Sequence, residues 1–165
     1  MVLNCDAANK MVKSLNADLE KLIKEEENNH KYSYTPGETD YEIPSYNLKE
    51  VSAKMDTINQ KIIKLKHAIN VFNTSTVVDG FGFTVDEALV RLAILNKRRN
   101  TLSEMRSMPE ISRNISYRQS EPEIVKPNFS LAEAEEMYQK VNMEVIALQQ
   151  ALNRTNLLKT FEIDI

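Results

Sequence analysis

Two histidines and one cysteine are the side chains of this sequence best suited to metal or nucleophilic chemistry. Glu27 and His30 form a Glu-x-x-His pair, the spacing that binds iron in ferritin-like helical bundles. That chemistry needs a second such pair, but Lys64 stands three positions before His67, the other histidine. Cys5 is the only cysteine, so it can form neither an internal disulfide nor a zinc site. We therefore expect no metal and no cofactor.

Motifs that mark common catalytic sites are absent from the sequence. It contains no Gly-rich phosphate loop, no HExxH and no GxSxG. His67 has no serine, cysteine or carboxylate at the spacing of a general-base arrangement, and it lies beside an apolar helix face. We therefore predict no catalytic residue, and the sequence favours a protein that is not an enzyme.

Basic residues are concentrated between residues 91 and 118, where they could bind an anion such as a nucleic-acid phosphate. Lys97, Arg98 and Arg99 are consecutive, so on a helix they spread around more than half of the circumference and form no single patch. The net charge of -3 also gives no general attraction to nucleic acid or to an anionic membrane. We therefore expect no nucleic-acid partner, and we predict that Arg99 pairs with a carboxylate of another helix.

Asparagines recur near the ends of two segments with helical periodicity, in INVFNT (69–74) and LNRTN (152–156). Asparagine is a poor residue inside a helix, but it can end one or bond an open backbone carbonyl. One interpretation is therefore a pair of C-terminal caps. The other is a polar pocket for a small ligand or an anion, completed by charged residues of the stretch near residue 120. The candidate residues of this pocket are Asn70, Asn73, Arg118, Glu121, Glu123 and Asn156.

The elements that would position these residues are four segments with apolar residues at helical spacing. They span approximately residues 6–29, 47–73, 85–108 and 131–158. The second segment has the clearest pattern, with steps that alternate between four and three residues. Such a period of 3.5 residues keeps one apolar stripe facing a partner helix along its whole length. The stripe consists of Val51, Met55, Ile58, Ile62, Leu65, Ile69 and Phe72.

Helix starts are also visible, because three segments begin with a polar residue followed three positions later by glutamate. In a capping box, the first side chain accepts a bond from the backbone amide of the glutamate, and the glutamate carboxylate reaches back. These pairs are Asn47 with Glu50, Thr84 with Glu87, and Ser130 with Glu133.

The composition agrees with an all-α protein. Its 165 residues fit one domain over 1–165, and three glycines with no tryptophan argue against a turn-rich β-sandwich. We predict an antiparallel bundle of four long helices with coiled-coil-like packing. The first residues lack the pattern of a signal peptide, and no apolar stretch is long enough to span a membrane, so we expect a cytoplasmic protein without a membrane partner.

Three connections interrupt the helical pattern. Residues 30–46 form an insertion with two prolines and four tyrosines, which is either a partner-facing loop or a mobile excursion. Residues 74–83 hold Asp79-Gly80, a reverse-turn signal, and could form a small β-hairpin or cover one end of the bundle. Residues 109–129 contain three prolines and are predicted to be an extended connection, with strand pairing to the 77–83 loop as an alternative.

Five stretches follow one another along the chain: LNADLEKLIKEE, INVFNTST, TVDEALVRLAILNKRRNTL, SYRQSEPEIV and LQQALNRTNLLKTFEI. In this order they resemble the septicolysin-like family of small bacterial helical proteins. The resemblance covers most of the chain apart from residues 30–46, and it implies a helical fold. Two positions depart from the family pattern: Leu157 stands where a tryptophan usually follows the last asparagine, and Pro122 interrupts the arginine-serine-glutamate stretch.

The long apolar seams and the tyrosine-rich insertion favour a non-enzymatic interaction or scaffold protein. We expect it to self-associate through its helices as a homo-oligomer, or to bind a protein partner. Two alternatives stay open. The name of the resembled family suggests a membrane-active, pore-forming toxin, for which the apolar loop 77–83 is the one candidate tip. The other alternative is a small-ligand or anion-binding protein that uses the pocket named above.

Overall fold

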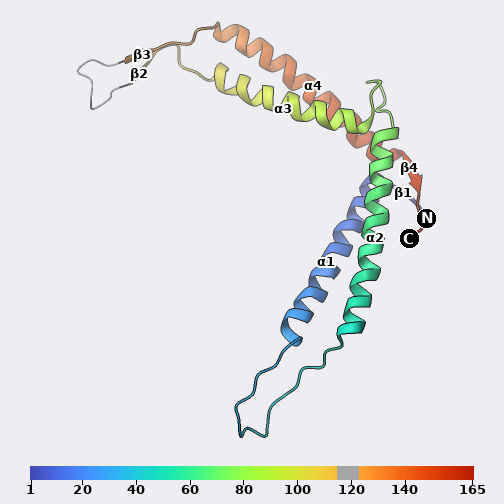
Figure 1. Ribbon diagram of the computed structural model, residues 1–165. Coiled ribbons are helices and arrows are strands. Elements are labelled where there is room, and N and C mark those ends of the chain that lie inside the picture. The colour runs from blue at the N-terminus through green and yellow to red at the C-terminus, as the bar shows by residue number, and fades with distance from the viewer. Residues whose placement is uncertain (115–122) are drawn as a thin grey trace. The chain divides into compact units, whose positions relative to one another are not determined.

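Four helices dominate the structure, a computed structural model that describes residues 1–114 and 123–165 (Figure 1). This confirms the prediction of a mostly helical fold. Capping chemistry supports the three predicted starts: Thr84 and Glu87 form both halves of a capping box, and the amides of Glu50 and Glu133 donate to Asn47 at 3.2 Å and to Ser130 at 3.3 Å. The helices are α1 (Cys5–Asn29), α2 (Leu48–Ser75), α3 (Val85–Arg106) and α4 (Leu131–Leu158).

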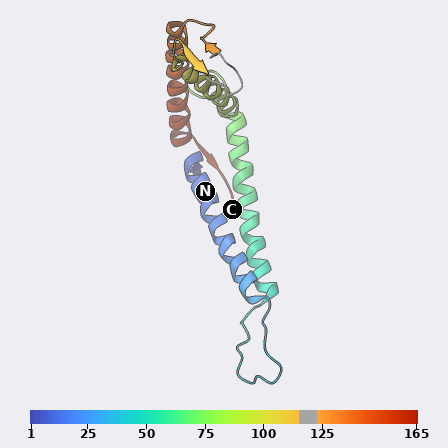
Figure 2. The same cartoon turned by 90° about the vertical axis from the view of Figure 1, so that its left-hand side faces the viewer.

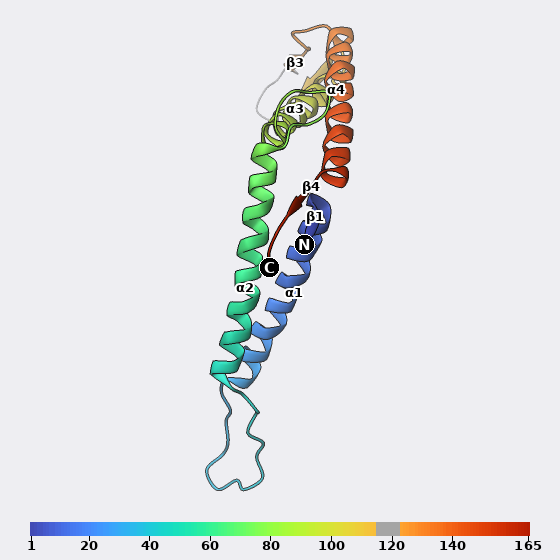
Figure 3. The ribbon, with the colours of Figure 1, turned by 90° about the vertical axis from the view of Figure 1, so that its right-hand side faces the viewer.

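The chain divides into two compact units, and the first contains Met1–Asn73 and Asn156–Ile165. Its helices α1 and α2 run side by side in all three ribbon views (Figures 1, 2 and 3). Beside them, the chain ends form an antiparallel pair of strands, β1 (Val2–Asn4) and β4 (Thr160–Glu162). The amino terminus of Met1 donates to the carbonyl of Ile163 at 2.9 Å, which brings the two termini together.

The apolar stripe predicted for the second segment forms the core of this first unit. Leu65 is completely buried, and no residue of the stripe is exposed. The ring of Phe72 lies 5.4 Å from that of Phe161, which joins the end of α2 to β4. The buried residues of the unit are Cys5, Ala8, Val51, Ile62, Leu65, Ile69 and Phe72.

The second unit contains Thr74–Thr155 and consists mainly of α3 and α4. The predicted small hairpin is present before α3, where Val77 and Thr84 form an isolated bridge around the Asp79-Gly80 turn. A further antiparallel pair, β2 (Ser112–Asn114) with β3 (Glu123–Val125), follows α3. The predicted extended stretch 109–129 therefore pairs with itself where it is described. The buried residues of the unit are Val78, Val85, Ala88, Leu102, Ala134, Val145, Leu148, Leu152 and Thr155.

Each unit thus has its own seam between neighbouring helices, as the heptad spacing predicts. The packing of all four helices into one bundle, and a single domain over the whole chain, stay predictions.

Candidate functional site

The residues predicted to form a polar pocket lie in both units and partly outside the described residues, so the pocket stays a prediction. Asn70 and Asn73 lie near the end of α2 and Asn156 near the end of α4, all within the first unit, whereas Glu123 is an exposed residue of β3 in the second unit. The other two candidates, Arg118 and Glu121, lie outside the described residues.

The asparagines near the ends of α2 and α4 do not lie at the positions that the capping interpretation predicts. Helix α2 continues to Ser75 and α4 to Leu158, so Asn73 and Asn156 lie inside the final turns. The Oδ1 atoms of both side chains are buried and accept no hydrogen bond. Neither residue therefore ends its helix, and the interpretation that these two asparagines terminate α2 and α4 is wrong.

The side chains proposed for nucleophilic or metal chemistry have structural roles. His30 ends α1, where its backbone amide donates to the carbonyl of Glu26 at 2.9 Å. Burial raises the pKa of the Cys5 thiol, which favours the unreactive protonated form. Within the described residues, no group of three or more histidine, cysteine, aspartate or glutamate side chains could hold a metal ion. No helix formed by these residues is long and apolar enough to cross a membrane.

Three arginines of α3 reach across to α4 and connect the two helices. The Nε of Arg91 donates to Glu144 at 3.0 Å, and Arg99 lies 3.5 Å from the amide oxygen of Asn142. The prediction of a carboxylate partner for Arg99 is therefore wrong, because the carboxylates pair with its neighbours along the helix. Their positions run in opposite order on the two helices, so these contacts support the antiparallel register of α3 and α4.

The third arginine, Arg106, belongs to the most densely connected polar cluster of the second unit. Its Nη1 donates to both carboxylate oxygens of Glu135, at 3.0 and 3.2 Å, and its guanidinium lies 3.7 Å from the centroid of the Tyr138 ring. Hydrogen bonds from Gln139 and Arg106 hold the pKa of Glu135 below its ordinary value. Because the carboxylate of Glu135 already neutralises the charge of Arg106, this cluster suits the attachment of α3 to α4 better than the binding of a free anion.

The insertion between α1 and α2 extends past the ends of both helices (Figures 2 and 3). Tyr32, Tyr34 and Tyr41 stack there with centroid distances of 4.9 to 6.3 Å, and all three remain exposed. Tyr46 fixes the end of the loop, because its hydroxyl donates to Glu26 at 2.6 Å. This hydrogen bond raises the pKa of Tyr46 to about 12. Exposed stacked tyrosines are typical of surfaces that contact proteins, which agrees with the partner-facing interpretation.

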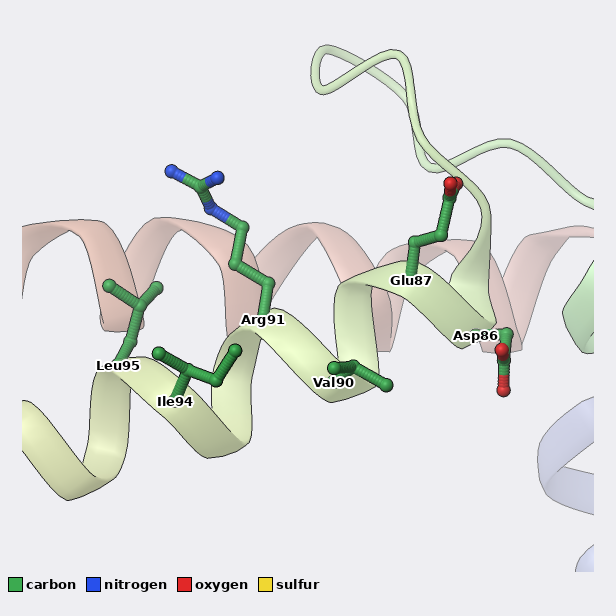
Figure 4. A pocket seen from close by; sticks show the side chains of 6 residues that line it. All are labelled: Asp86, Glu87, Val90, Arg91, Ile94 and Leu95. Carbon is green, nitrogen blue, oxygen red and sulfur yellow. The ribbon is translucent and has the colours of Figure 1, made fainter.

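The outer face of α3 carries an apolar groove of about 480 Å³ (Figure 4). Val90 and Ile94 lie at its centre on the near side of the helix in Figure 4, with the α4 ribbon behind. Their side chains are 57% and 65% exposed, which is unusual for valine and isoleucine at adjacent turns of one helix. The other residues that line the groove are Asp86, Glu87, Arg91 and Leu95.

A second groove, of about 470 Å³, lies between α1 and α2 in the first unit. Leu22 and Ile58 form its apolar part, and the side chains around them include the ion pair of Asp18 with Lys21 at 3.1 Å. Leu22 and Ile58 are only half-buried.

The geometry defines a helical protein built on two helix pairs, with exposed apolar side chains and without a recognisable catalytic constellation in its described residues. No family model and no curated protein matches the chain. Its structure is similar to the crystal structure of a functionally unknown conserved protein from Corynebacterium diphtheriae, with a TM-score of 0.68 over 98% of this chain and 100% of that chain. The two sequences are 20% identical, so the similarity shows the fold alone.

Proposed function

We propose that this protein is a non-enzymatic interaction protein that self-associates through its helices. The observation that carries the proposal is the apolar face of α3, where the side chains of Val90 and Ile94 are exposed. Removing apolar surface from water is favourable, so adjacent exposed aliphatic side chains favour a partner.

Coiled-coil-like packing supports a helical partner over a small ligand. The apolar stripe of α2 already packs in this way within the first unit, and two helices that present apolar faces can pack in the same manner across an interface. A bundle of four helices is the arrangement that we propose for the assembled state. The proposed homo-oligomer would supply the covering helices.

The mass of the protein in solution tests this proposal. We expect sedimentation equilibrium or light scattering to give a mass that rises with concentration above the 18.9 kDa of one chain. The measurement should extend to about 1 mM, because a small helical contact supports only weak association. A mass of one chain over the whole range would remove the proposal.

Membership of the septicolysin-like family is a proposal that rests on the matching stretches of sequence, and a cytoplasmic location likewise stays a prediction. The membrane-active alternative rests on the family name, and a vesicle-leakage assay decides it. No release of a trapped dye at any protein concentration would exclude that activity.

A further inference from the structure

The outer face of α3 is complementary to itself. Because an α-helix turns by about 100° per residue, positions 86, 90, 94, 97 and 101 lie within an arc of about 80°. This arc begins with Asp86, continues with the exposed pair Val90 and Ile94, and reaches Lys97, with Arg98 at its border. The face is therefore acidic at one end, apolar in the middle and basic at the other end.

Such an order of charges fits a second copy of the same helix running in the opposite direction. About a two-fold axis near position 92, Val90 of one copy meets Ile94 of the other, because both are two residues from the axis. Asp86 and Arg98 are both six residues from the axis, and Glu87 and Lys97 are both five. The acidic end of each copy thus lies level with the basic end of the partner copy.

Three of the four charges of this face are available for such pairing, whereas the Glu87 carboxylate already accepts hydrogen bonds from Thr84 in the capping box. None of the ion pairs formed among the described residues engages Asp86, Lys97 or Arg98. The helix dipole accounts for acidic residues in the first turn of α3, but its effect fades within one turn of each end. Lys97 and Arg98 lie about two turns before the last residue of α3, Arg106, so the dipole does not explain their place on this face.

We propose that two copies of this protein associate in antiparallel fashion through the outer faces of α3, related by a two-fold axis near residue 92. This inference rests on the proposed function and adds to it the surface and the symmetry. The groove of about 480 Å³ around Val90 and Ile94 receives the apolar side chains of the partner, and the two charged ends fix the direction.

A matched pair of lysine substitutions tests the surface. Ile94 and Met143 are 65% and 64% exposed on different helices of the same unit, so Ile94→Lys and Met143→Lys add the same charge at equal exposure. We expect Ile94→Lys to raise the dissociation constant at least about tenfold, and Met143→Lys to leave it within about twofold. Far-ultraviolet circular dichroism checks that both variants keep the helical content of the parent.

Reversing the charges at the two ends of the α3 face tests whether the two copies of α3 run antiparallel. The variant Asp86→Lys makes the face of α3 more basic, and the double variant Lys97→Glu/Arg98→Glu makes it acidic. We expect each variant alone to associate about tenfold more weakly, because like charges then meet across the axis. An equimolar mixture should recover association as a mixed dimer, which native mass spectrometry separates from the two homodimers by mass.

The outcomes separate this inference from the proposed function. If the parent protein is monomeric at every concentration, both the proposed self-association and the α3 interface are wrong. A parent that associates, with Ile94→Lys unchanged or with Met143→Lys as the disruptive variant, overturns the α3 interface and leaves self-association standing. Loss of association in both charge variants without recovery in the mixture overturns the antiparallel direction.

Discussion

Replacement of Leu65 by alanine tests whether the seam between α1 and α2 is the core that holds the first unit together. Leu65 is completely buried, whereas Ile63, two residues earlier on the same helix, is 58% exposed. The pair Leu65→Ala and Ile63→Ala therefore compares the same type of truncation on the two sides of α2.

The expected loss follows from the buried groups that are removed. Leucine to alanine deletes three carbon groups at about 0.8 kcal/mol each, which gives about 2.4 kcal/mol of lost burial. The cavity left behind raises such losses to about 2–5 kcal/mol in well-packed proteins. Within the first unit α2 packs against α1, so the site can contract, and we expect about 2.5–3.5 kcal/mol. Ile63→Ala should change the stability by less than about 0.5 kcal/mol, because alanine also has the better helix propensity.

Urea unfolding followed by circular dichroism measures this difference. With a slope of about 1–3 kcal/mol per molar urea, Leu65→Ala should lower the midpoint by about 1 M or more, while Ile63→Ala should leave it nearly unchanged. Both variants should be measured at one low protein concentration, so that association does not alter the midpoints. Equal losses for the two variants would refute the assignment of the buried face of α2.

Three further perturbations test other local features. Thr84→Ala removes the capping box of α3 and should cost about 1 kcal/mol in urea unfolding, whereas Ser103→Ala on the same helix should cost less, because Ser103 caps nothing. The absorbance of phenolate should show Tyr46 ionising with a pKa of about 12; Glu26→Gln should lower this pKa, and an unchanged value would contradict the hydrogen bond between the two side chains. Since this pKa is raised in the folded state, the stabilisation from the Tyr46–Glu26 bond is present below pH 10 and is lost as the pH rises through about 12. The pKa of Glu135 is lowered by Gln139 and Arg106, so the pH dependence of the folding stability is opposite to that of Tyr46. The stabilisation of the fold by the Glu135 carboxylate is present above the ordinary pKa of 4.5 and is lost as the pH falls through the lower, folded-state value. An NMR titration of the Glu135 carboxyl should show that its pKa is lowered less in Arg106→Met than in the parent. The control Arg154→Met should leave the pKa of Glu135 unchanged.

The helices could be predicted from the sequence because their signals are local. Alternating steps of four and three residues fix which side of α2 is buried, and the pair of Thr84 and Glu87 fixes where α3 begins. Both signals lie within a few residues of the feature that they predict. The ends of α4 agree with the predicted range 131–158 for the same reason.

The pairing of the chain ends could not be predicted in this way. Strands β1 and β4 have three residues each, and the hydrogen bond from Met1 to Ile163 spans 162 positions. Three-residue strands are too short to show a period, and no local pattern records which distant segment they meet. The partner of Arg99 was mispredicted for a related reason: the register between α3 and α4 decides whether it meets Asn142 or a carboxylate.

The outer face of α3 was missed although its signal is present in the sequence. Val90 and Ile94 are four residues apart, the spacing of one helix face, but they lie outside the stripe formed by Ala88, Leu92 and Leu95. An apolar pair outside the stripe becomes informative only when the structure shows that the neighbouring helix does not cover it. The sequence therefore predicted the core of the helix pair, whereas the exposed face required the structure.

The concentration dependence of stability connects the exposed face with the proposed assembly. If a second copy covers Val90 and Ile94, association stabilises the folded protein by mass action, so the unfolding midpoint must rise with protein concentration. The Ile94→Lys variant must then lose this dependence, because the lysine charge prevents the covering contact, while its midpoint at low concentration stays near that of the parent. A substitution that instead lowered the midpoint equally at all concentrations would show that Ile94 contributes to the folding of one chain. The dependence of the unfolding midpoint on protein concentration thus distinguishes two roles of Ile94. It shows whether this side chain contacts a second copy or contributes to the folding of one chain.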